Sequence, residues 1–315
     1  MKTTLWTTVV GLSLGLGLTG VSTAQVDPAP SAEPKQEAKQ LYNEQADAKA
    51  DIEAALAKAK KENRRVLIQW GANWCGWCHK LDETFTKERT VARTLMYEYD
   101  VVHVDIGRFD KNTDLAEKYK ADLKQGVPFL TILASDGTVV TNQETGSLEE
   151  GAKHDPAKVD GFLQKNKAEY KKAEDILQAG LSTAARENKI AFLHFGAPWC
   201  GWCHKLEDWM ARKDINAVLS KQFVDIKIDT DRTIGGKEVL DKYTKGESTG
   251  IPWFAFLDPK GDVLVTSMGP KGNVGFPYEP FEVDWFKQML TKSAKNLSAE
   301  EIDTVIGTMG KGKER

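Results

Sequence analysis

One motif occurs twice in the sequence in nearly identical form. A shift of 125 residues places residues 71–81 (GANWCGWCHKL) on residues 196–206 (GAPWCGWCHKL), and ten of the eleven positions are identical. The single mismatch is Asn73 against Pro198. Matches continue on both sides of the motif; the pairs are Glu62/Glu187, Asn63/Asn188, Asp105/Asp229, Gly126/Gly250, Pro128/Pro252 and Gly137/Gly261. Because solenoid repeats are only about 20–50 residues long, this repeat predicts two tandem domains.

Length and composition agree with that prediction and exclude two classes of protein. The 315 residues fit two domains of roughly 150 residues each. The 43 Lys and Arg against 46 Asp and Glu give a net charge of −3, which excludes the basic field of a nucleic-acid-binding protein. The mean hydropathy is −0.44, and no apolar run after residue 25 approaches the roughly 20 residues of a membrane-spanning helix. A polytopic membrane protein is therefore excluded.

Residues 1–24 have the pattern of a signal peptide. Lys2 precedes an apolar stretch at residues 5–21, and small residues at positions 22 and 24 indicate cleavage before Gln25. An uncleaved membrane anchor is the alternative. We expect residues 25–45 to be a disordered linker, because residues 27–39 hold three prolines among alanines and charges. The mature protein is expected to be periplasmic or secreted, with no stable membrane insertion after signal removal.

Each repeat has the same order of expected elements. A helix precedes a β-rich run, the cysteine motif forms the next turn, and a second helix, further strands with a hairpin and a closing helix follow. The expected strands are residues 65–70, 101–105, 129–133, 190–195, 223–229 and 253–257, the hairpin turns are residues 135–138 and 258–262, and the closing helices begin near residues 156 and 281. This order predicts an α/β fold with two tandem α/β sandwiches around mixed central sheets. The expected domains are residues 46–165 and 166–293, and a helical tail at residues 294–315 begins with a capping box of Ser298 and Glu301.

All four cysteines lie in two Cys-x-x-Cys pairs, Cys75–Cys78 and Cys200–Cys203. A helix dipole stabilises a thiolate at the first cysteine, and the second cysteine, three residues later on the same face, can resolve a mixed disulfide. The alternative is a pair of inert structural disulfides. Such short loops constrain little unfolded-chain entropy, so the spacing favours redox chemistry.

On these residues each repeat resembles a thioredoxin-fold domain. The sequence is most similar to bacterial exported thioredoxin-like proteins in which Trp-Cys-x-x-Cys is followed by His-Lys or Lys-Lys, and the resemblance covers about residues 46–165 and 170–293. It implies that Cys75 and Cys200 are the attacking nucleophiles. It also implies that Cys78 and Cys203 are the resolving thiols.

The resemblance extends to the residues around the cysteines. It implies that Pro128 and Pro252 are cis-prolines beside the sulfurs, and that the preceding residues, Val127 and Ile251, pair with substrate through their backbone. Other residues are expected to support the cysteines by shielding or packing; they are Trp74, Gly76, Trp77, Trp199, Gly201 and Trp202. We expect His79 and His204 to be solvated residues of the first helical turn.

The chain also departs from thioredoxin itself. The residues between the cysteines are Gly-Trp instead of Gly-Pro, so a reduction potential cannot be borrowed from thioredoxin. Thioredoxin has a buried acid six residues before its first cysteine, and these positions hold Gln69 and His194. We expect His194 to accept a proton at the second site, which Gln69 cannot do at the first. A histidine satisfied by core hydrogen bonds is the alternative.

The second domain has a long loop at residues 269–280 where the first has a short stretch. We expect Phe276 and Tyr278 in this loop to form one wall of a substrate groove, with Trp253 opposite. The alternative is that these aromatic side chains cover the core.

These predictions together describe a thiol–disulfide oxidoreductase that acts on cysteines of other proteins. Its expected partners are cysteine-containing proteins and an unidentified redox partner, with no cofactor, no metal and no nucleic acid. A thiol-dependent binding or assembly module is the main alternative. Cys-x-x-Cys-His is also the attachment pattern of c-type haem, but haem attachment predicts neither the β-rich run before each motif nor the proline-led strand after it. A zinc site shared by both cysteine pairs would require the two domains to face each other.

Overall fold

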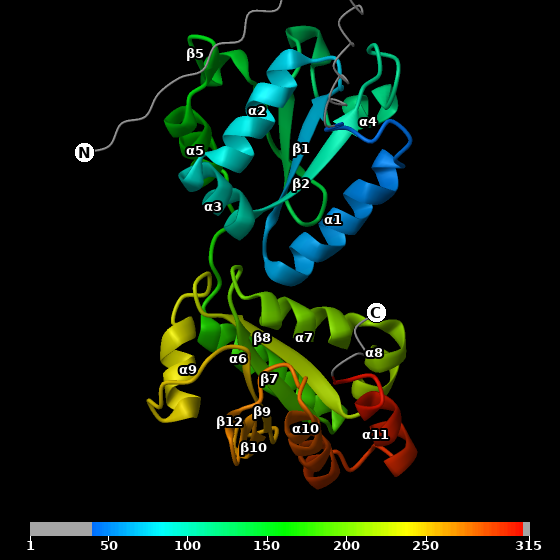
Figure 1. Cartoon of the computed structure of the whole chain (residues 1–315), viewed down its shortest axis with the longest axis vertical. Helices are drawn as coiled ribbons and strands as arrows, with labels where there is room; N and C mark the ends of the chain where they lie inside the picture. The colour runs from blue at the N-terminus through cyan, green and yellow to red at the C-terminus, as the bar shows by residue number, and fades with distance from the viewer. Residues whose placement is uncertain (1–39, 311–315) are drawn as a thin grey trace, which may run out of the picture. The chain divides into compact units, whose positions relative to one another are not determined.

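The computed structural model describes residues 40–310 of the chain (Figure 1). The predicted signal peptide and residues 25–39 of the predicted linker lie outside the described residues. No helix within residues 40–310 is both long and apolar enough to cross a membrane.

The first domain is built on a four-stranded mixed sheet with strand order β2-β1-β3-β4. Strand β1 pairs in parallel with β2 and antiparallel with β3. The helices of the domain are α1 (Ala48–Glu62), α2 (Gly76–Lys87), α3 (Arg89–Glu98), α4 (Thr113–Lys118) and α5 (Pro156–Lys165). The strands are β1 (Arg65–Gly71), β2 (Tyr99–Asp105), β3 (Phe129–Leu133), β4 (Val139–Glu144), β5 (Glu149–Glu150) and β6 (Lys153–His154).

The second domain repeats this architecture, with strand order β10-β9-β7-β8. Its central strand β7 is again parallel to one neighbour, β8, and antiparallel to the other, β9. The helices are α6 (Ala173–Glu187), α7 (Gly201–Ala211), α8 (Lys213–Leu219), α9 (Gly236–Thr244), α10 (Pro280–Ser293) and α11 (Ala299–Ile306). The strands are β7 (Ile190–Gly196), β8 (Phe223–Asp229), β9 (Trp253–Leu257), β10 (Val263–Thr266), β11 (Met268–Gly269) and β12 (Gly272–Asn273). The predicted α/β fold with mixed central sheets is confirmed.

Helices cover both faces of each sheet, which explains the sequence of the central strands (Figure 1). In β1, Val66 and Ile68 face one core, shared with α1, and Leu67 faces another, shared with α2. In β7, Leu193 packs towards α6 and Phe192 packs towards α7 and α10. Strands buried on both faces are continuous apolar runs instead of alternating ones. Each buried central strand ends at the glycine that begins the cysteine motif, Gly71 in β1 and Gly196 in β7.

The first folded unit begins earlier than the sequence indicates. Residues 40–45 were expected in the linker, but Tyr42 is fully buried. The Asn73 side-chain oxygen accepts hydrogen bonds from the backbone N–H groups of Leu41 and Tyr42, at 3.0 and 2.9 Å, and its amide donates to the Tyr42 carbonyl at 2.9 Å. Asn73 therefore attaches this segment to the turn that carries Cys75.

The predicted tail helix is confirmed as α11, with the capping box of Ser298 and Glu301. It is more than a tail, because Ile302 and Val305 belong to the same core as Phe286 of α10. The Trp209 indole of α7 also donates to the Thr308 hydroxyl just after α11, at 2.9 Å. The second domain therefore extends beyond residue 293.

Candidate functional site: two disulfides at helix N-termini

In each domain the central strand ends in a tight turn, and a helix begins at the first cysteine. Cys75 is the N-cap of α2 and Cys200 is the N-cap of α7. Each accepts a hydrogen bond on Sγ from the backbone N–H of the second cysteine, at 3.1 and 3.2 Å. An N-cap sulfur lies at the positive end of the helix dipole, where a thiolate is favoured.

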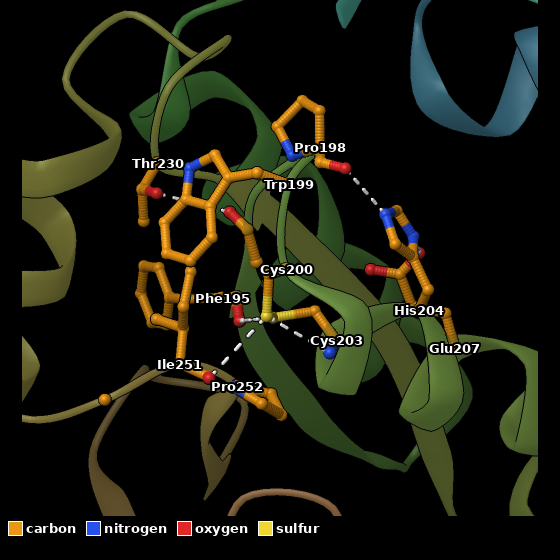
Figure 2. Close-up of a disulfide and its surroundings, with 12 residues drawn as sticks. Phe195, Pro198, Trp199, Cys200, Cys203, His204, Glu207, Thr230, Ile251 and Pro252 are labelled. Carbon is orange, nitrogen blue, oxygen red and sulfur yellow. Dashed lines mark hydrogen bonds and ion pairs between the residues drawn. A yellow bond between two sulfur atoms is a disulfide. The ribbon is translucent and has the colours of Figure 1, made fainter. Parts of the chain in front are cut away.

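The sulfurs form two disulfides within the motifs, Cys75–Cys78 and Cys200–Cys203. The second cysteine of each pair is buried on the core side of its helix. The first cysteine is also buried, and it lies between the exposed tryptophan that precedes it and the cis-proline segment that faces it (Figure 2). The two sulfurs of a pair thus have different neighbours, the domain core for the second cysteine and the tryptophan and cis-proline segment for the first.

A proline-led strand faces each first cysteine. The Val127–Pro128 and Ile251–Pro252 peptide bonds are cis. Cys75 Sγ lies 3.5 Å from the Val127 carbonyl oxygen, and Cys200 Sγ lies 3.6 Å from the Ile251 carbonyl oxygen (Figure 2). The structure therefore brings Val127 and Ile251 to the sulfurs, as the resemblance implied.

The tryptophans before the cysteines lie at the surface and do not pack into the core. Trp74 is 44% exposed and Trp199 is 57% exposed. Each indole N–H is held within its own domain: Trp74 donates to the Gly107 carbonyl at 2.7 Å, and Trp199 donates to the Asp231 carboxylate at 3.0 Å. The hydrogen bonds fix exposed aromatic faces beside the disulfides. The glycines between the cysteines, Gly76 and Gly201, have open space around them.

The two histidines after the motif share a structural role that their sequence positions do not indicate. His79 Nε2 is 2.9 Å from the Asn73 carbonyl oxygen, and His204 Nε2 is 2.9 Å from the Pro198 carbonyl oxygen. Each ring connects the first helical turn to the loop that precedes the first cysteine. Both histidines are partly exposed residues of the first helical turn, as expected, and each has this additional contact.

The expected groove beside the second site is only partly formed. Phe276 stacks on Trp202 with ring centroids 6.3 Å apart, and Tyr278 meets Trp202 edge-on at 5.8 Å. Trp253 is only 1% exposed and packs in the core on the α6 side of the sheet. Trp253 therefore cannot form the opposite wall, because β9 is a central strand whose side chains are covered on both faces.

The side chains at the two positions below the cysteines, Gln69 and His194, both have hydrogen-bond partners. Gln69 donates to the Tyr42 hydroxyl at 2.9 Å and to the Cys78 carbonyl at 3.3 Å. His194 is buried, and its Nε2 lies 2.7 Å from the Asp225 carboxylate on β8. Burial raises the pKa of Asp225, but the charge and hydrogen bond of His194, together with lysine charges, hold the pKa of Asp225 below its ordinary value. His194 thus holds a surface-strand carboxylate, which agrees with the alternative of a satisfied core histidine.

Comparison with known proteins assigns both halves of the chain. Residues 47–135 match a family described as thioredoxin-like. Residues 160–291 match a family named for a DsbH-type thioredoxin and described as a protein of unknown function, DUF255. Both matches include a complete Cys-x-x-Cys motif, and neither is a haem-protein family.

The chain is also similar to proteins named as disulfide isomerases, at low sequence identity. The chain is 24% identical to protein disulfide-isomerase erp38 of Neurospora crassa over 79% of this chain and 63% of that protein. It is 24% identical to protein disulfide-isomerase tigA of Aspergillus niger over 61% of this chain and 55% of that protein. The chain thus spans less than two thirds of these relatives. A disulphide isomerase from Xylella fastidiosa Temecula1 is 30% identical, with 40% of this chain and 95% of that chain covered and a TM-score of 0.37.

Fold, motif and family matches define a protein with two thioredoxin-like domains, each with an intact Cys-x-x-Cys pair. Residues 47–135 match the thioredoxin-like family and residues 160–291 match the DsbH-like family, so the chain carries two such domains in tandem. Within residues 40–310, no group of three or more His, Cys, Asp or Glu side chains could hold a metal ion.

Proposed function

We propose that this protein is an exported thiol–disulfide oxidoreductase that exchanges dithiol and disulfide with cysteines of other proteins at two sites. The observation that carries the proposal is the matched position of Cys75 and Cys200. Each is the N-cap of a helix, and its sulfur lies within 3.6 Å of a backbone carbonyl that precedes a cis-proline. A sulfur in such a position is favoured as a thiolate, and the carbonyl beside it can pair with an extended chain.

The chemistry needs only the sulfurs of the two partners. In the reducing direction, the thiolate of the first cysteine attacks a substrate disulfide; a mixed disulfide forms, the substrate S–S bond breaks, and one substrate sulfur leaves as a thiolate. The second cysteine then loses its proton and attacks the first, which forms the Cys-x-x-Cys disulfide and releases the other substrate sulfur. The same steps run backwards to oxidise a substrate dithiol. A separate dithiol or disulfide partner restores the starting state.

Protein substrates fit the surroundings of the sulfurs better than small thiols do. The backbone carbonyls of Val127 and Ile251 face the reacting sulfurs and can accept hydrogen bonds from an extended segment, as an unpaired strand edge does. Exposed aromatic surface surrounds the second site, where Trp199 and Trp202 are 57% and 46% exposed. Aromatic side chains of this kind contribute strongly to protein contacts.

The full chain with Cys75→Ser, with Cys200→Ser and with both changes tests the proposal. We expect each single variant to retain turnover of a reduced or scrambled disulfide-containing protein through its intact site, and the double variant to lose turnover. Stopped reactions analysed by mass spectrometry should show the substrate attached to Cys75 or Cys200. Full substrate binding by the double variant, with no turnover by the wild type, would instead support a binding module.

Export is proposed from the sequence of residues 1–24. We expect the mature protein to begin at Gln25 and to be found in the periplasm or the medium. N-terminal sequencing of the protein purified from each cell fraction measures this directly. A mature protein that begins at Met1 and sediments with membranes would contradict cleavage and favour the uncleaved anchor.

A further inference from the structure

A buried carboxylate lies one helical turn after the second cysteine of the second site. Glu207 is four residues after Cys203 on α7, and its side chain is 7% exposed. Lys227 on β8 faces it with Nζ 2.7 Å from Glu207 Oε2, and His204 Nδ1 lies 4.0 Å from the same oxygen. Figure 2 shows the Glu207 carboxylate between His204 and the disulfide.

Gly196 lies beside both this carboxylate and the sulfur of the resolving cysteine, Cys203. A β-carbon on Gly196 would lie 3.6 Å from Cys203 Sγ and 3.4 Å from Glu207 Oε1. The two reactive atoms therefore border the same small volume, and glycine adds no side chain to it. His194, which the sequence suggested for this place, is instead engaged with Asp225.

The first site holds a different group at the matching place. A β-carbon on Gly71 would collide with the hydroxyl oxygen of Tyr42 and with Cys78 Sγ. Tyr42 is fully buried and packs against Cys75 and Cys78. The acid at the position matching Glu207 is Asp82, whose side chain is one methylene shorter and has an oxygen 4.0 Å from His103 Nε2.

The single mismatch in the repeated motif explains this difference. Asn73 makes the three hydrogen bonds that hold Leu41 and Tyr42. Pro198 has no amide side chain and cannot hold such a segment. The Tyr42 hydroxyl therefore lies beside the second cysteine at the first site only. At the second site the matching space, next to Gly196, is bordered by the Glu207 carboxylate.

We propose that Glu207 accepts the proton of Cys203 when that cysteine resolves a mixed disulfide, and that the first site, with Tyr42 in this place, resolves more slowly. The proposal rests on the proposed thiol–disulfide exchange. The Cys203 S–H proton goes to the Glu207 carboxylate, and the sulfur electron pair forms the bond to Cys200. The bond from Cys200 to the substrate sulfur breaks, and that sulfur leaves with its electron pair and can take the proton. Burial raises the pKa of Tyr42, so its hydroxyl stays protonated and does not serve as the base for Cys78.

Full-length single-site proteins test the proposal. Cys75→Ser/Cys78→Ser leaves only the second site, and Cys200→Ser/Cys203→Ser leaves only the first. Each is reduced, mixed with glutathione disulfide, and stopped with acid at successive times, so that mass spectrometry measures formation and decay of the glutathione mixed disulfide. In the second-site protein, Glu207→Gln should slow decay roughly 10²-fold, the lower end of general-base effects, and leave formation unchanged. The matched Asp82→Asn change in the first-site protein should alter decay less than about twofold, on the same scale of effects.

A further variant separates proton transfer from structural damage. Glu207→Gln leaves Lys227 without its carboxylate, so the double variant Glu207→Gln/Lys227→Met is measured in parallel. Decay as slow as in Glu207→Gln supports the proton acceptor, whereas recovery to the wild-type rate overturns the proposal and assigns the defect to an unpaired lysine. Wild-type decay in Glu207→Gln also overturns it. Failure of the reduced wild-type second-site protein to be oxidised by glutathione disulfide at all would contradict the proposed function itself.

Discussion

Asn73 and Pro198 differ at the one unmatched position of an eleven-residue motif, and that difference decides what surrounds each disulfide. Asn73 brings in Tyr42 from a segment 31 residues earlier. At the second site no such segment is held among residues 40–310, and Glu207 approaches the same place from α7. Two sequences that are nearly identical around the sulfurs therefore have chemically different interiors.

His154 gives the first domain a testable dependence on pH. Its side chain is fully buried against the edge of Trp77, with ring centroids 5.4 Å apart. Burial, with a smaller contribution from Lys80, lowers the pKa of His154 to about 4. The unfolded chain then binds a proton that the folded chain does not, between about pH 6.5 and 4. The free energy of unfolding of the first domain should fall by roughly 2–4 kcal/mol as the pH decreases through this window.

Hydrogen exchange of the β1 amides reports the first domain alone and measures this dependence. His154→Leu removes the titrating group, so its exchange protection should change much less between pH 6.5 and 4. An equally steep loss of protection in His154→Leu would show that another group is responsible.

At the scale of elements, the loop between β12 and α10 connects the second site to the core of its domain. Phe276 meets two rings, Trp202 at 6.3 Å and Trp209 at 6.4 Å. Tyr278 meets Trp202 at 5.8 Å. Trp209 belongs to the core and Trp202 lies at the surface between the cysteines. Phe276 thus connects the surface ring of Trp202 to the core, whereas Tyr278 contacts the surface ring.

We expect Phe276→Ala and Tyr278→Ala to separate stability from substrate binding. Phe276→Ala removes a ring that packs on the core and should lower the free energy of unfolding by about 2–4 kcal/mol, less than a fully buried phenylalanine would. Tyr278→Ala should change stability little and raise the KM for a protein substrate several-fold through loss of aromatic contact. Denaturant unfolding and steady-state kinetics of both variants measure these effects. A large loss of stability in Tyr278→Ala would make its ring a cover for the core instead of a binding surface.

At the scale of the whole molecule, much of the architecture follows from the sequence. The 125-residue repeat predicts two domains, and the apolar runs predict buried central strands, because both signals can be read directly from the order of the residues. The cysteine pairs are placed correctly for the same reason. The roles of Tyr42 and Glu207 could not be predicted this way, since each depends on contacts between distant segments. A signal for Glu207 exists in retrospect: both repeats carry an acid one turn after the second cysteine, at Asp82 and Glu207.

The burial of Tyr42 sets where the first domain can be divided from the rest of the chain. A recombinant first domain that starts at residue 46, the boundary suggested by the sequence, would omit Leu41 and Tyr42 and leave the Asn73 amide without its backbone partners. The volume beside Cys78 would then open to water, and its measured reactivity would describe an altered site. A fragment meant to represent the native first site has to begin at or before Gln40.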